Sequence, residues 1–143
     1  IRTDTPIQIR NPNSTRPWQH VLEPLSGYLL LGQRILEGEA VSDSYNFGPD
    51  FDGKKTVLNV VEGVIETHQK GSYQVVESDE NRRESQLLQL NCDRAKLELG
   101  WSPKWDFDMT IRETSKWYVS EQQGLDMYAE TIRQIRSYFG MGK

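Results

Sequence analysis

The stretches of this chain that resemble β-strands are short, and helix-length stretches separate them. Alternating or β-branched runs predict strands at residues 6–10, 44–49, 73–77 and 86–90. Spacing of apolar residues, with capping residues and glycines at the ends, predicts helices at 24–38, 56–71, 91–100, 108–122 and 126–139. Thr56 and Asp108 are the predicted caps of the helices that they begin, and Gly71 is the predicted residue that closes the helix from Thr56. Such short strands cannot build a large sheet of their own. The sequence therefore predicts a small mixed α/β lobe that another part of a protein completes.

The size of the chain supports one domain, which we take as residues 1–143. Its 143 residues, 36% of them hydrophobic and 10% aromatic, are enough for a buried core. The chain begins at Ile1 without the pattern of a signal peptide, so we expect a fragment of a longer polypeptide. No apolar stretch approaches the roughly 18 residues of a membrane span, and we expect a cytoplasmic protein.

Charge and cysteine content exclude several classes of partner. The net charge of −4 argues against nucleic acid, which needs a basic surface. Four arginines within residues 1–34 are compatible with a small anionic ligand, although solvated arginines would give the same pattern. A single cysteine, Cys92, excludes an internal disulfide, and with only His20 and His68 beside it no Cys/His zinc site is expected.

Motifs that carry catalysis are absent from the sequence. It contains no glycine-rich dinucleotide turn, no phosphate-binding lysine loop and no nucleophile elbow. No Tyr is followed four positions later by Lys, a pair that would supply an acid/base group. We therefore predict no catalytic residue in this chain, which has the residues of a binding unit.

One segment identifies a family. The run Arg-Pro-Trp-Gln-His-Val-Leu-Glu-Pro-Leu at residues 16–25 resembles the point where extended short-chain dehydrogenases/reductases enter their sugar-nucleotide-binding lobe, and looks specifically like CDP-glucose 4,6-dehydratases. Three later runs agree in order and spacing: Tyr-Asn-Phe-Gly-Pro at 45–49, the stretch 86–103 ending in Leu-Gly-Trp-Ser-Pro, and Thr-Ser-Lys-Trp-Tyr at 114–118. The resemblance covers about residues 5–120 and implies that the chain is a C-terminal substrate-binding lobe whose Rossmann half is absent.

The resemblance also implies a reaction and its partners. The full-length enzyme would convert CDP-glucose to CDP-4-keto-6-deoxyglucose with NAD bound by the missing N-terminal half. The partners would be the nucleotide sugar and that Rossmann domain, with a homodimer left open, and the fragment alone would be inactive. The alternatives are a related NAD(P)-dependent nucleotide-sugar epimerase, reductase or other 4,6-dehydratase, and a binding module without catalysis.

Arginine suits a diphosphate because its guanidinium is a rigid, permanently charged fork of donors. By the resemblance, Arg16 is the first candidate for the diphosphate; the alternative is a surface ion pair with Glu23 or Asp4. Either Arg82 or Arg83 is the second phosphate candidate.

Two polar residues are weaker candidates for substrate binding. Asn46 could donate to the ligand or only close a turn, and Glu84 could accept from a sugar or ribose hydroxyl or be an exposed acid. The large aromatics Trp101, Trp105 and Trp117 are predicted to lie in the core.

Overall fold

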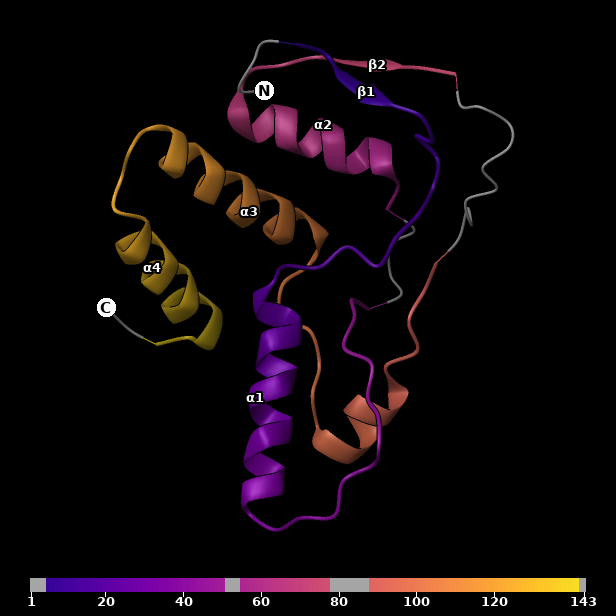
Figure 1. Cartoon of the computed structure of the whole chain (residues 1–143), viewed down its shortest axis with the longest axis vertical. Helices are drawn as coiled ribbons and strands as arrows, with labels where there is room; N and C mark the ends of the chain where they lie inside the picture. Colours follow the sequence, from indigo (N-terminus) through magenta and orange to yellow (C-terminus); the bar gives the residue numbers. More distant parts are fainter. Residues whose placement is uncertain (1–4, 51–54, 78–87, 142–143) are drawn as a thin grey trace.

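The computed structural model describes residues 5–50, 55–77 and 88–141. Their elements follow in the order β1 (Ile7–Ile9), α1 (Leu22–Leu36), α2 (Val57–His68), β2 (Tyr73–Val75), the π-helical turn η1 (Ala95–Leu99), α3 (Phe107–Gln122) and α4 (Met127–Phe139) (Figure 1). The predicted fold class, a small mixed lobe of helices and short strands, is confirmed.

Most of the helices gather at one end of the molecule. There α2 packs against β1 and against α3, and α3 packs against α4 (Figure 1). The strands β1 and β2 pair in parallel, with Ile7 opposite Tyr73 and Ile9 opposite Val75. At the other end α1 packs against η1, and the connector from η1 to α3 runs back along α1 (Figure 1).

The helices begin where capping side chains satisfy free backbone N–H groups. Thr56 and Asn59 form a reciprocal capping box at the start of α2, and Asp126 caps α4, both at predicted positions. The cap predicted for α3 at Asp108 is wrong. Asp106 has the extended backbone of a cap and its Oδ1 accepts from the Met109 N–H at 2.7 Å, which places Asp108 inside the first turn.

The left-handed residue that ends α2 is Gln69, with φ of 51°, and not the predicted Gly71. Gly71 also has a positive φ, of 108°, but it lies in the turn that leads into β2. The helix therefore stops two residues earlier than its glycine suggested.

Two predicted strands do not form. Residues 44–49 and the described part of 86–90, residues 88–90, have no strand structure. A strand needs a neighbouring backbone for its ladder, and none pairs with them among the described residues. A side chain instead bonds to the backbone of residues 44–49: Gln19 Nε2 donates to the Phe47 carbonyl at 2.9 Å. Gln86 and Leu87 lie outside the described residues.

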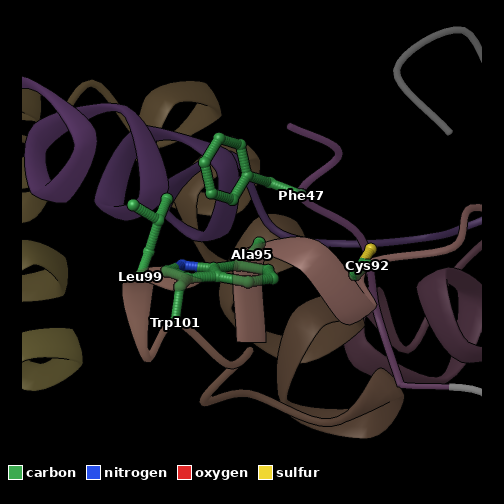
Figure 2. Close-up of a cluster of buried hydrophobic side chains, with 5 residues drawn as sticks. All are labelled: Phe47, Cys92, Ala95, Leu99 and Trp101. Atoms are coloured by element: carbon green, nitrogen blue, oxygen red, sulfur yellow. The ribbon is translucent and has the colours of Figure 1, made fainter. Parts of the chain in front are cut away.

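The main hydrophobic cluster lies between η1 and the side of α1 that carries Gly27, Leu30 and Leu31, which we call the inner side of α1. It contains Phe47, Cys92, Ala95, Leu99 and Trp101, with the Phe47 ring edge-on to Trp101 at 5.0 Å between centroids (Figure 2). The prediction for Trp101 is therefore correct.

Trp105 and Trp117 are only partly buried, contrary to the prediction for them. Their polar N–H edges and their positions in a connector and between two helices keep them near the surface. Trp117 Nε1, for example, donates to Thr131 Oγ1 at 3.0 Å between α3 and α4.

No helix in the described part of the chain is long and apolar enough to span a membrane.

Candidate functional site

A pocket of about 350 Å³ lies at the N-terminal end of α3. Its size falls within the range of roughly 300–1,000 Å³ that is typical of small-molecule sites. Three segments form its walls: the end of the loop after β1, the region before α2, and the connector into α3. The lining residues are Arg16, Trp18, Pro49, Asp50, Lys55, Pro103, Lys104, Trp105, Asp106, Phe107 and Asp108.

Backbone contacts bring the first two walls together. Thr15 and Thr56 form an isolated antiparallel bridge, and the Val57 N–H donates to the Ser14 carbonyl at 2.9 Å. Trp18 Nε1 donates to the Lys55 carbonyl at 3.0 Å. As a result Arg16 and Lys55, which are distant in sequence, line the same pocket.

The connector into α3 supplies the opposite wall. The Lys55 ammonium lies 4.8 Å from the centroid of the Phe107 ring, a cation–π contact that links this wall to the region before α2. Asp106 is engaged as the cap of α3. The first turn of the helix therefore faces the pocket with its position fixed.

Charged and aromatic side chains both line the pocket. Two bases, Arg16 and Lys55, contribute positive charge, whereas the Lys104 ammonium lies over the Tyr138 and Phe139 rings, which do not line the pocket. Two of the acids are already committed within the protein: Asp50 pairs with Lys96, and Asp106 caps α3. Trp18, Trp105 and Phe107 add flat apolar surface. A ligand that combines phosphate with a ring system suits such a lining.

Of the predicted site residues that the structure describes, one lines the pocket and one does not. Arg16 lines the pocket, and its Nη1 donates to the Thr15 carbonyl at 2.7 Å. Asn46 is exposed and does not line it; its side chain donates to the Asn91 carbonyl at 3.1 Å, which joins two segments of the fold. Arg82, Arg83 and Glu84 lie outside the described residues.

Sequence reasoning missed three contributors to the pocket: Lys55, Lys104 and Phe107. No local pattern marks them, since they become neighbours of Arg16 only through the bridge beside Thr56 and the fold of the connector.

The histidine and cysteine of this region have packing roles. His20 is 4% exposed, its Nδ1 accepts from the Leu22 N–H at 3.3 Å, and burial lowers its pKa. Burial likewise raises the pKa of Cys92, which disfavours the reactive thiolate. No cluster of three or more His, Cys, Asp or Glu that could hold a metal is found within the described residues.

No protein-family model matches the chain. The chain is 38% identical to the CDP-glucose 4,6-dehydratase of Salmonella typhimurium (strain LT2) over 133 residues, which are 92% of the chain and 37% of that enzyme. The predicted resemblance is confirmed. A UDP-glucose 4-epimerase of Rhizobium meliloti is 25% identical over 84% of the chain and 35% of its own length. The chain thus spans about a third of the length of the curated relatives it matches.

A solved structure shares the fold of the described residues. A crystal structure of dTDP-glucose 4,6-dehydratase from Bacillus anthracis str. Ames, in complex with NAD, superimposes with a TM-score of 0.64. The match has 24% sequence identity and covers 87% of this chain and 37% of that one. The described residues therefore have the fold of the C-terminal portion of a 4,6-dehydratase.

Proposed function

We propose that this chain is the nucleotide-sugar-binding domain of a 4,6-dehydratase that converts CDP-glucose to CDP-4-keto-6-deoxyglucose. The observation that carries the proposal is the 38% identity to a CDP-glucose 4,6-dehydratase. The pocket supports it, because Arg16, the residue predicted to bind the diphosphate, lines that pocket. The lower identity of 25% to a UDP-glucose 4-epimerase favours the dehydratase over the epimerase.

Arg16 binds the diphosphate in this proposal. Its guanidinium presents parallel N–H donors to the phosphate oxygens. Lys55 adds positive charge near the anion, while Trp18 and Trp105 offer flat surface to a sugar or base ring. The domain would contribute to catalysis by holding the sugar in one position.

NAD does not fit the described residues. Their sheet has two strands, and the sequence lacks the glycine-rich turn that receives a dinucleotide at the end of a larger parallel sheet. We therefore assign no cofactor contact and no catalytic step to them. In the proposed full-length enzyme a Rossmann domain outside this chain binds NAD and supplies the catalytic residues.

The side of α1 that carries Leu25, Leu29 and Leu36, which we call the outer side, is the surface that this Rossmann domain would cover. Large apolar side chains there are exposed, among them Leu25 at 45%, Leu29 at 68% and Leu36 at 89%. Contiguous apolar surface of this kind marks an interaction site. Since the chain spans 37% of the length of its CDP-glucose dehydratase relative, a protein of that length has ample chain to cover it.

The test is the affinity of the full-length protein for CDP-glucose, measured by calorimetry with Arg16 variants. Arg16→Ala should weaken binding by about 10- to 100-fold, since a hydrogen bond to a charged group contributes about 1.5–3 kcal/mol. Arg16→Lys should recover only part of this, because a lysine lacks the fork. Arg10→Ala is the matched control, as Arg10 is exposed and outside the pocket. Equal affinity of wild type and Arg16→Ala would refute the assignment.

A further inference from the structure

Glu23 is a buried carboxylate in the first turn of α1. It is 1% exposed, although a glutamate at this place in a helix is usually solvated. Its hydrogen bonds come from neutral donors. Oε1 accepts from the N–H groups of Trp105 at 2.8 Å and Lys104 at 3.1 Å. Oε2 accepts from the Lys104 N–H at 3.1 Å and from the Tyr138 hydroxyl at 2.6 Å. Burying a carboxylate is costly, so these donors must be held firmly in place.

Two of the donors belong to the wall of the pocket. Lys104 and Trp105 lie in the connector that lines it, and the next residue, Asp106, caps α3. The Trp105 ring packs against His20 at 4.8 Å and edge-on to Tyr138 at 5.2 Å. The carboxylate therefore fixes the backbone of the connector directly before the turn that faces Arg16.

The other end of the connector is anchored to the same helix. Trp101 Nε1 donates to Ser26 Oγ at 2.9 Å, and that hydroxyl lies 3.0 Å from the Tyr138 hydroxyl. Residues of α1 thus hold the connector at both ends, and α4 contributes the Tyr138 hydroxyl and the Phe139 ring, which lies 5.0 Å from the Lys104 ammonium. Figure 1 shows this connector running beside α1 before it enters α3.

We propose that Glu23 is a positioning residue for the nucleotide-sugar pocket: by binding the N–H groups of Lys104 and Trp105, it sets the wall opposite Arg16. The inference rests on the function proposed for that pocket. Glu23 itself does not line the pocket, so it acts on the ligand only through the connector.

Two substitutions separate positioning from general stabilisation. Glu23→Gln keeps the size of the side chain but puts an NH₂ group, which cannot accept a hydrogen bond, among N–H and O–H donors. Tyr138→Phe removes one donor to the same carboxylate, yet it keeps the ring contacts with Trp105 and Lys104. Glu23→Asp, with its shorter side chain, serves if the glutamine variant does not fold.

Both variants are measured in the full-length protein by hydrogen exchange of the peptide covering residues 101–107 and by steady-state kinetics with CDP-glucose. Glu23→Gln should accelerate exchange in this peptide and raise KM about tenfold, a loss of about 1.4 kcal/mol, with kcat within about twofold. Glu23→Asp should raise KM about threefold, because it keeps both acceptors at a longer reach. Tyr138→Phe should leave KM within about twofold, although its melting temperature falls.

The outcomes are distinct. Unchanged exchange and unchanged KM in Glu23→Gln would overturn the inference, as would equal changes in KM in Glu23→Gln and Tyr138→Phe. If wild-type protein neither binds nor converts CDP-glucose, the proposed function fails. Hydrogen exchange then decides whether Glu23 fixes the connector: faster exchange in Glu23→Gln alone supports this, and exchange like wild type rejects it.

Discussion

The two sides of α1 differ in what covers them. On the inner side Gly27 lies so close to the Phe47 ring that a methyl group there would overlap it, and Glu23 is buried against the connector. On the outer side Gly32 has nothing within 4 Å of the position a Cβ would take, and Leu29 is 68% exposed. Both sides carry leucines, since Leu30 and Leu31 pack against the core cluster and Leu25 and Leu29 are exposed. Helical periodicity therefore identifies the helix, but it does not show whether this chain or another part of a protein covers a given side.

The largest difference in the free energy of unfolding should come from a glycine-to-alanine substitution made on each side of α1. Gly27→Ala should destabilise the chain by about 2–3 kcal/mol, because overpacking forces the Phe47 ring to move. Gly32→Ala should stabilise it by up to about 1 kcal/mol, since alanine favours a helix and meets no neighbour there. Urea unfolding measures both. Loss of stability in both variants would show that the outer side is covered within this chain.

The outer side should respond to a charge only when its partner is present. Leu29→Lys should change the stability of residues 1–143 alone by less than about 0.5 kcal/mol, as is usual at an exposed position. In the full-length protein it should cost about 1.5–3 kcal/mol, the value of burying a leucine. We also expect residues 1–143 alone to self-associate and Leu29→Lys to reduce this. A sharp monomeric sedimentation boundary at high concentration for the unmodified chain would argue against an apolar docking surface.

The contact between α3 and α4 differs from the outer side of α1, because both partners of its polar contacts belong to this chain. Glu113 is 5% exposed and accepts from Arg133 at 2.8 Å. Burial alone raises the pKa of Glu113, but the Arg133 hydrogen bond and the charges of Arg133 and Lys116 outweigh it, so the pKa lies below its ordinary value of 4.5.

Glu113→Gln should therefore cost about 1 kcal/mol at neutral pH, a modest value because the Arg133 side chain is 47% exposed. A carboxylate with a lowered pKa stabilises the fold above its ordinary pKa and loses this effect as the pH falls through the lowered one. The difference between variant and wild type should shrink over that acidic range. A constant difference from neutral to acidic pH would contradict the charge-based account.

Local chemistry made much of the fold predictable, and long-range contacts account for the rest. The cap at Thr56 was predicted because a capping side chain acts on backbone a few residues away, and the start of the last helix was predicted at Asp126, which caps it. The strand predicted at 44–49 failed because a ladder needs a distant partner. Arg16, which lines the pocket, was predicted as a diphosphate ligand through the family resemblance, whereas Lys55 and Lys104 reach the pocket only by tertiary contacts.

The burial of Glu23 had no signal in the sequence. An acid in the first turn of a helix is favoured there by the helix dipole, so surface exposure was the natural expectation, including a surface pair with Arg16. Its partners, Lys104, Trp105 and Tyr138, are all distant in sequence.

The most direct test of the account is product formation by the full-length protein with NAD and CDP-glucose, dTDP-glucose or UDP-glucose in parallel. We predict a 4-keto-6-deoxy nucleotide sugar from CDP-glucose, at a higher kcat/KM than from the other two, detected by mass spectrometry as the loss of one water. No 4-keto product from CDP-glucose would contradict the central claim, and a product from UDP-glucose or dTDP-glucose alone would reassign the nucleotide.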